Sequence, residues 1–471
     1  MKRYFLLLIA ALSVGAFSSC SDDDAPTPPP TNVDSSVVRL KGDITTSQTL
    51  SASKKYLLDG FVYVKSGATL TIEPGTVIMG DKATKGTLVI TRGAKINAEG
   101  TAAKPIIFTS AQPAGARAQG DWGGVILLGK AKVNPAGGEA KIEGGLVVPA
   151  GGNEKDYIWY GGNDDTDNSG VMKYVRIEFG GIYYSPDNEI NGLTMGGVGN
   201  GTKISYIQVY RSGDDAYEWF GGSVNCDHLV ATYTWDDDFD TDNGFSGKIQ
   251  FGVAQRYKAI ADVSGSNGFE SDNDANGSEL TPQTKAIFSN MTIVGPIIAG
   301  NSASGINANF QHGAQIRRNS SMSLINSIII GFPIGVYIDD TKVAGHKTSQ
   351  NASEGNLKFK NNIIAGAVTV SKSEWSGVDN AAWTAWWNAT ETQVIVKAED
   401  VQLNNPYVYS SAIGASKGTP SFLLKATSPA VAGAVIPEGL GFANVAYRGA
   451  FDATTDWTSG WTNYEAESTK Y

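Results

Sequence analysis

Apolar residues in this chain come in short runs that tight turns separate. Val64-x-x-Gly67-Ala68-x-Leu70 recurs 26 residues later as Ile90-x-x-Gly93-Ala94-x-Ile96. Each copy has the pattern of two short strands around a glycine turn. Long amphipathic helical periodicity is nearly absent. The pattern therefore predicts many short strands and few helices.

A second pattern repeats through the centre of the chain: an apolar residue, a ladder residue two positions later, and an aliphatic residue three positions further. The ladder residues are 20 to 36 residues apart, as in a solenoid whose loops swell on one side. The copies begin at Met172, Ile204, Val224, Phe288, Leu324 and Phe359, with ladder residues Tyr174, Tyr206, Cys226, Asn290, Asn326 and Asn361, and Tyr257 filling the gap. We expect the three asparagines to hydrogen-bond from rung to rung.

These repeats predict an all-β fold, a parallel β-helix with loop insertions over residues 37–370. One rung cannot bury its apolar face, whereas stacked rungs form parallel sheets around a continuous core. A β-sandwich would need steadier spacing and hairpin turns, and is disfavoured. Residues 371–471 should supply the C-terminal rungs and a cap. A short helix with Trp383, Trp386 and Trp387 at Asn380–Thr390 should cover the open end.

The N-terminus reads as an export signal. Lys2 and Arg3 precede an apolar run that ends in small residues, so residues 1–19 fit a signal peptide. Cys20 follows these residues and resembles the acylated cysteine of a lipobox, which predicts a lipid anchor, with palmitate among its acyl chains; an ordinary cleaved signal is the alternative. Residues 20–36 form a Pro-rich linker. Cys226 is then the one remaining thiol, and we expect it to be buried.

Charge and histidine content exclude two classes of partner. The formal net charge is -10, and loss of Lys2 and Arg3 leaves 35 basic against 47 acidic residues. Such a chain has no basic stripe for nucleic acid. The three histidines are scattered without the spacing of zinc ligands.

Several segments resemble a poorly characterised family of Bacteroidota outer-membrane lipoproteins with a right-handed, pectate-lyase-like parallel β-helix. They are Tyr56–Val64, Leu70–Thr76, Asp121–Val125, Tyr447–Phe451 and Trp457–Trp461. The acidic triplet after Cys20 is similar to the surface-export signal of lipoproteins in that group. The resemblance implies a right-handed solenoid and a place on the outer face of the outer membrane, and it says little about activity.

Acidic residues align on three neighbouring rungs. The segment Asp214–Glu218 matches Asp236–Asp240, which matches Ser266–Glu270. Strand alternation should turn the aromatic fourth residue of each segment inward and stack the last carboxylates on the outside. Carboxylates on rungs about 4.8 Å apart repel each other, so they need a cation or a shared proton.

The first solution is a calcium site, because carboxylate oxygens from several rungs suit a hard cation. Asp238–Gly244 also places oxygens at alternate positions, although it lacks the full EF-hand pattern. The candidate ligands are Asp215, Glu218, Asp238, Asp240, Asp242, Glu270 and Asp272. The alternative is a solvated acidic face without an ion.

The second solution is glycoside hydrolysis by a protonated carboxyl beside an ionised one. Ser212–Asp215 is similar to the Gly-Asp-Asp motif of polygalacturonases, but the order of motifs in this chain is reversed. The candidate catalytic residues are Asp214, Asp215, Asp237 and Asp240, and His312 and Arg317 could continue the series. A lyase is disfavoured, because no Lys or Arg aligns on these rungs as a base.

Aromatic residues beside the acidic rungs suggest a sugar-binding platform, since ring faces cover apolar sugar faces. The candidates are Tyr183, Tyr184, Trp219 and Trp235. The alternative is that these rings pack under loops. We expect a non-catalytic surface lipoprotein that binds a glycan or a partner such as a TonB-dependent transporter complex. A polysaccharide hydrolase and a structural coat protein are the alternatives.

Overall fold

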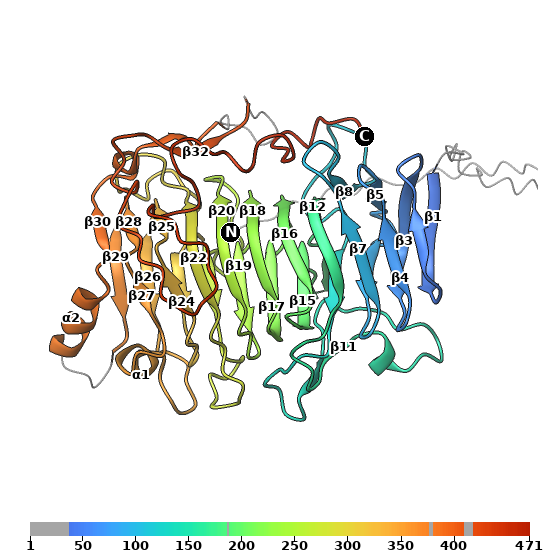
Figure 1. Ribbon diagram of the computed structural model, residues 1–471, viewed down its shortest axis with the longest axis horizontal. Helices are drawn as coiled ribbons and strands as arrows, with labels where there is room; N and C mark the ends of the chain where they lie inside the picture. The colour runs from blue at the N-terminus through green and yellow to red at the C-terminus, as the bar shows by residue number, and fades with distance from the viewer. Residues whose placement is uncertain (1–36, 186–187, 376–379, 409–417) are drawn as a thin grey trace, which may run out of the picture. The chain divides into compact units, whose positions relative to one another are not determined.

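The computed structural model describes residues 37–185, 188–375, 380–408 and 418–471. Cys20 and the acidic triplet after it lie outside these residues. The described chain forms a right-handed parallel β-helix around one sheet of 26 strands (Figure 1), which confirms the predicted fold. Within the described residues, no helix has the length and apolar character needed to cross a membrane.

Three faces of parallel strands build the solenoid. The first, here called the acidic face, comprises β1 (Val37–Ile44), β3 (Lys55–Val64), β6 (Thr87–Ile90), β9 (Gly124–Leu128), β15 (Leu193–Val198), β17 (Tyr217–Gly222), β19 (Phe239–Asp242), β21 (Phe269–Ser271), β23 (His312–Ile316), β26 (Ile334–Ile338) and β29 (Thr369–Ser373). The second comprises β2 (Gln48–Leu50), β4 (Thr69–Ile72), β7 (Lys95–Glu99), β12 (Gly170–Glu178), β16 (Lys203–Tyr210), β18 (Asn225–Thr232), β20 (Lys248–Gln255), β22 (Ile287–Val294), β24 (Ser323–Ile325) and β27 (Phe359–Lys360). The third begins with the first halves of β1 and β3 and continues through β5 (Val77–Gly80) and β8 (Ile106–Ser110). It then comprises the second halves of β12, β16, β18, β20 and β22, followed by β25 (Ile328–Ile330), β28 (Ile363–Ala365) and β30 (Gln393–Ile395).

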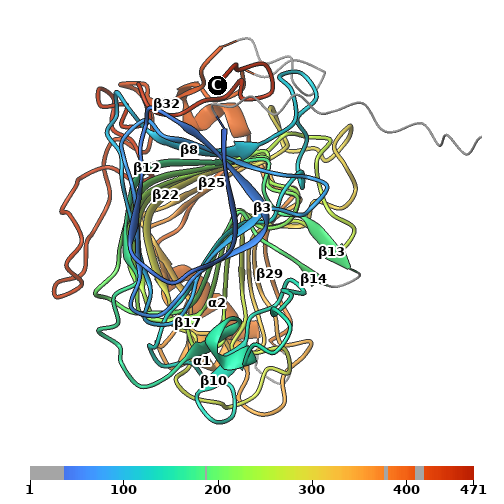
Figure 2. The ribbon, with the colours of Figure 1, turned by 90° about the vertical axis from the view of Figure 1, so that its right-hand side faces the viewer.

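Insertions between rungs carry the remaining elements. Three antiparallel pairs lie outside the main sheet: β10 (Glu139–Lys141) with β11 (Trp159–Gly161), β13 (Tyr183–Ser185) with β14 (Asn188–Glu189), and β31 (Leu403–Asn405) with β32 (Ser421–Leu424). The helices are α1 (Thr348–Ser353) and α2 (Asn380–Ala389), with short 3₁₀ turns at Glu154–Asp156 and Ala398–Val401. Viewed along the solenoid, β10 and the β13–β14 hairpin project beyond the rungs (Figure 2).

Helix α2 covers the C-terminal end of the core, as predicted. Trp383, Trp386 and Trp387 pack against the core cluster, and the Trp387 ring lies 6.4 Å from that of Phe359 in the last rung of the second face. Cys226 is buried and free, also as predicted.

The ladder position differs from its prediction on two rungs. Ile204 pairs with Cys226, so His228 rather than Cys226 aligns with Tyr206, and Phe251 rather than Tyr257 takes the next place. These ladder residues have positive φ, between 49° and 63°, because they form the corner between the second and third faces. Asparagine tolerates this conformation more readily than aromatic residues do, which explains Asn290, Asn326 and Asn361.

In the described part of the chain the three asparagines do not bond to one another, contrary to the prediction; Asn290 and Asn326 instead hold the C-terminal segment. We call residues 425–471 the strap, because this segment runs back across the corner of the solenoid (Figure 1). Asn326 donates to the Val435 carbonyl and accepts from its N–H, at 3.0 and 2.9 Å. Asn290 donates to the Tyr447 carbonyl at 2.9 Å.

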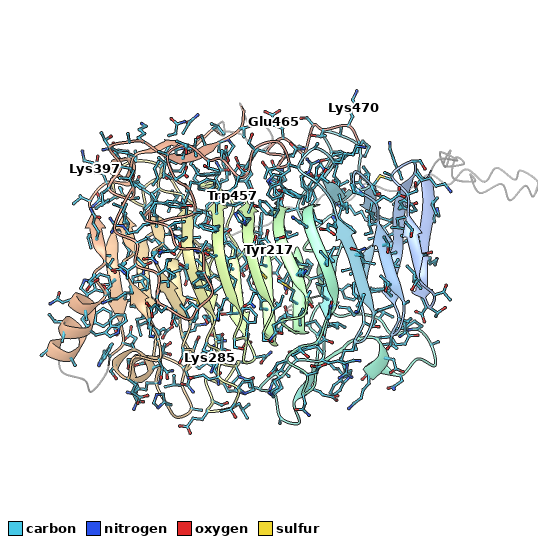
Figure 3. The ribbon with its side chains drawn as sticks, in the orientation of Figure 1. Tyr217, Lys285, Lys397, Trp457, Glu465 and Lys470 are labelled. Carbon is cyan, nitrogen blue, oxygen red and sulfur yellow. The ribbon has the colours of Figure 1, made fainter. Side chains whose placement is uncertain are left out.

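The strap reaches the opposite end of the solenoid. Trp457, labelled in Figure 3, lies edge-on to His228 at 5.0 Å. The Tyr471 hydroxyl donates to Glu178, and Lys55 donates to the Tyr471 carbonyl at 2.6 Å. The sequence predicts rungs and a cap for this segment and does not predict the strap.

Candidate functional site

Three carboxylates on neighbouring rungs follow the predicted register. Glu218 pairs with Asp240, and Asp240 with Glu270, on the outer side of the acidic face. We call these three residues the acidic column. On the inner side Tyr217, Phe239 and Phe269 stack with ring centroids 5.5 and 5.4 Å apart, and Figure 3 shows Tyr217 among the strands. Burial of the aromatic stack fixes which way the carboxylates point.

A second row of side chains precedes each strand and ties the rungs together. Asp215 accepts from the Asp237 N–H at 2.7 Å, and Asp237 accepts from the Asn267 N–H at 2.5 Å. Asn267 in turn accepts from the His312 N–H at 3.1 Å. One oxygen of each aspartate therefore holds the backbone of the next rung.

Three clusters of carboxylate oxygens result, each with its oxygens within 4.8 Å of one another. They are Asp214–Asp215–Asp236, Asp215–Glu218–Asp240 and Asp237–Asp240–Glu270. Asp215 and Glu218 are buried, with 7% and 6% of their surface exposed. The clusters bring six of the candidate carboxylates named from sequence together with Asp236.

Burial raises the pKa of the carboxyls in these clusters. For Asp215, Glu218 and Asp240 burial is the largest cause, and repulsion by neighbouring carboxylates adds to it. Burial also raises the pKa of Asp236 to about 6. Such groups favour the neutral form unless a positive charge joins them, so the clusters call for protons or a cation.

Arginine neutralises one end of the column. The Arg317 guanidinium contacts Glu270 and lies 2.8 Å from Asp272, which Arg318 also contacts at 2.5 Å. Arg317 follows β23, the strand paired with β21, so it lies one rung beyond the three acidic rungs. Although burial lowers the pKa of Arg317, Glu270 and Asp272 raise it overall. Arg317 therefore stays protonated and is unsuited to act as a base.

Three candidate ligands lie outside the clusters. Asp272 is occupied by the two arginines. Asp238 points inward, where its Oδ2 lies 2.9 Å from Nε of the fully buried Arg256. Asp242 accepts from the N–H of Asn243 at 2.5 Å. Asp238 departs from the prediction because it lies in the turn before β19, where strand alternation does not apply.

A groove with a volume of about 800 Å³ runs beside the clusters. Its lining includes the candidate aromatics Tyr183 and Trp235 and the carboxylates of Asp214 and Asp236. Tyr183 is 58% exposed. The Trp235 indole N–H donates to Asp262 at 2.8 Å, which fixes the ring at the wall of the groove.

The other two candidate aromatics do not line the groove. Trp219 is fully buried, and its ring stacks on Tyr217 and Phe245 at 5.9 and 5.4 Å. Its prediction as a ligand-binding residue was wrong, since it follows Tyr217 by two residues and shares its inward face. Tyr184 packs under the Lys85 ammonium, 3.8 Å from its ring centroid.

Several residues around the site were not predicted from the sequence. Asn191 donates to Glu218 at 2.5 Å, and Glu143 lies against both. Arg256 contacts the carbonyls of Thr234, Asp236 and Asn267 beneath the clusters. Insertions and a separate rung supply these residues, so no repeated motif marks them.

The profile of the family described as the pectate-lyase like beta helix domain matches residues 42–405. The match spans more than half of the chain, so the protein belongs to this family. No curated protein sequence matches the chain.

Two solved structures are similar to the chain at low sequence identity. The catalytic unit of the thermostable GH87 alpha-1,3-glucanase from Streptomyces thermodiastaticus strain HF3-3 has 11% identity over 76% of this chain and 62% of its own, with a TM-score of 0.36. Pectate lyase Pel9A has 14% identity over 83% of this chain and 88% of its own, also with a TM-score of 0.36. The chain thus spans less than two thirds of the glucanase.

Proposed function

We propose that this protein is a lipid-anchored surface protein that binds a glycan in the groove and does not cleave it. The observation that carries the proposal is the groove itself, in which Tyr183 and the fixed Trp235 ring stand beside carboxylates. Aromatic faces cover the apolar faces of sugars, and carboxylates accept hydrogen bonds from hydroxyl groups. Cys20 would hold the protein at the outer membrane, where a transport complex is its expected partner.

A calcium ion at Asp215, Glu218 and Asp240 belongs to the same proposal. Hard carboxylate oxygens within 4.8 Å of one another match the donors that Ca²⁺ prefers. This cluster lies on the side of the column away from Arg317, and in the described structure no guanidinium forms an ion pair with Asp215, Glu218 or Asp240. The ion would remove their repulsion and hold the rungs beside the groove in register.

A glycoside hydrolase is the second candidate, and one observation favours it. Oxygens of Asp214 and Asp236 lie within 4.8 Å of each other at the groove. A retaining hydrolase uses two carboxyls about 5 to 5.5 Å apart, one protonated and one ionised. Binding without cleavage remains our proposal, because the same carboxylates and their neighbours form overlapping clusters that suit a cation.

The test is titration of the full mature protein against a panel of defined oligosaccharides. Trp235→Ala and Tyr183→Ala should each weaken binding about tenfold, because each removes one stacking surface. Trp159→Ala is the matched control, since this ring lies against Lys155 and does not line the groove.

Two outcomes would contradict the proposal. Absence of binding to every glycan would favour a structural coat protein. Release of shorter oligosaccharides that stops in Asp214→Asn and Asp236→Asn would establish the hydrolase instead.

A further inference from the structure

The lining of the groove is strongly acidic. Glu189, Asp214, Asp236 and Asp262 all contribute carboxylates to it. Lys82 is the one basic residue among the lining residues of the described structure, and its Nζ lies 2.8 Å from Asp121, which is fully buried. The groove therefore surrounds any ligand that enters it with carboxyl groups, which favour a positively charged partner.

This charge disfavours a polyuronate. Each uronate would add a carboxylate next to Asp214 and Asp236, and like charges in a half-enclosed groove repel. The arginines that could compensate, Arg317 and Arg318, are paired with Glu270 and Asp272 and do not line the groove. A calcium ion in the neighbouring cluster would be coordinated by Asp215, Glu218 and Asp240, so its charge would be shared among these carboxylates.

One carboxylate oxygen beside the groove has no hydrogen-bond donor. Oδ1 of Asp236 is buried without a hydrogen-bond partner, whereas its Oδ2 accepts from the Ser264 hydroxyl at 2.7 Å. Asp214 brings a second carboxylate within 4.8 Å of it. An ammonium group has three N–H donors and a positive charge, so it would satisfy both carboxylates at once.

We propose that the groove selects a glycan carrying free amino groups, such as a glucosamine-rich oligosaccharide. Its ammonium group lies between Asp214 and Asp236, and its sugar ring rests on Trp235. This inference depends on the proposed glycan binding and adds the chemical class of the ligand.

The test is calorimetric titration of the full mature protein with four oligosaccharides of equal length, in constant calcium. These are oligomers of glucosamine, N-acetylglucosamine, glucose and galacturonate. The glucosamine oligomer should bind about tenfold more tightly than its N-acetylated counterpart, because acetylation removes the positive charge and leaves a single N–H donor. Added salt should reduce this preference through screening.

Isosteric variants locate the selectivity. Asp214→Asn and Asp236→Asn should each reduce the preference for the free amine several-fold, measured as the ratio of the affinities for the glucosamine and glucose oligomers. Glu99→Gln, at an exposed carboxylate on β7 outside the groove, is the matched control. Circular dichroism of each variant checks its fold, and the comparison of ligands on the unmodified protein stands without any variant.

The outcomes distinguish failure of the amino-glycan inference from failure of the proposed glycan binding. Equal affinity for amino and N-acetyl oligomers, or tighter binding of galacturonate, would overturn the amino-glycan inference and leave glycan binding intact. Failure of all four oligomers to bind, with other glycans bound, would likewise overturn this inference alone. If no glycan of any class binds, both the proposed glycan binding and the amino-glycan inference are contradicted.

Discussion

Asp240 belongs to two of the three oxygen clusters, and its Oδ1 is buried without a hydrogen-bond partner. The carboxylate thus lacks compensation unless a cation or a proton joins it. We predict that calcium raises the melting temperature of the protein by several degrees and that a chelator reverses this rise, because binding to the folded state stabilises it. Asp240→Asn should abolish most of the response in a thermal unfolding assay.

The control for this experiment is Glu99→Gln, which leaves all three clusters intact. Its melting temperature should respond to calcium as that of the unmodified protein does. A melting curve of the unmodified protein that ignores both calcium and chelator would rule out the cation site.

His312 predicts a specific pH dependence of stability. Burial is the main cause that lowers its pKa from 6.5 to about 4, and Lys372 adds to it. Burial therefore favours the neutral ring in the folded state, where Nδ1 lies 2.8 Å from Oδ1 of Asn267. Between these two pKa values the unfolded chain binds a proton that the folded protein does not, so the free energy of unfolding falls as the pH falls from about 6.5 to about 4.

The measurement is urea unfolding of the protein and of His312→Gln at about pH 7 and about pH 5. The variant lacks the titrating ring, so its free energy of unfolding should decrease less between the two pH values. Parallel decreases in both proteins would show that His312 does not contribute to the acid sensitivity.

Among the elements, the strap is held to the solenoid by hydrogen bonds from side chains to its backbone. Gln208 is buried, donates to the Asn463 carbonyl at 3.1 Å and accepts from its N–H at 2.8 Å. We predict that Gln208→Ala lowers the free energy of unfolding by about 1 to 3 kcal/mol, because it leaves both backbone groups without partners. Limited proteolysis should then cleave first within the strap.

Gln250 allows a second test of the strap, since it makes the same two bonds to Ala443, at 2.9 and 2.7 Å. Gln250→Ala should act like Gln208→Ala. Gln48→Ala on β2 is exposed and should have little effect. Equal protease resistance of all three variants would contradict the role of the glutamines.

Strand patterns could be predicted where a local rule governs them. Alternation placed Phe239 inward and Asp240 outward, and the repeated motif aligned both with their neighbouring rungs. The same rule, applied to Trp219, would have placed it in the core. The corner residues were harder, because Cys226 and His228 fit the spacing about equally and only the pairing of strands distinguishes them.

For the whole molecule, the sequence predicts an anchor at Cys20. Cys20→Ala should release the protein from the membrane fraction, because it removes the acylated residue. Cys226→Ala is the matched control, since that thiol is buried in the core and should not affect fractionation. Membrane retention of Cys20→Ala in a fractionation blot would contradict the lipid anchor.

Contacts between distant parts of the chain could not be predicted. Lys82, Tyr183, Asp214 and Asp262 meet in the groove, although insertions and rungs far apart in sequence carry them. The ion pair of Asp238 with Arg256 and that of Glu270 with Arg317 depend likewise on how rungs stack. Only the aspartate motifs recur in the sequence, and together with the aromatic residues beside them they indicated the site.

The strap also bears on the order in which the chain is made. Synthesis proceeds from the N-terminus, and early rungs can stack before later ones exist. The residues that cover Tyr174, Tyr206 and His228 come near the end of the chain, at Trp457 and Trp461. A product of premature termination would keep this aromatic row uncovered. Complete and truncated chains would therefore differ in a surface that proteases and chaperones can recognise.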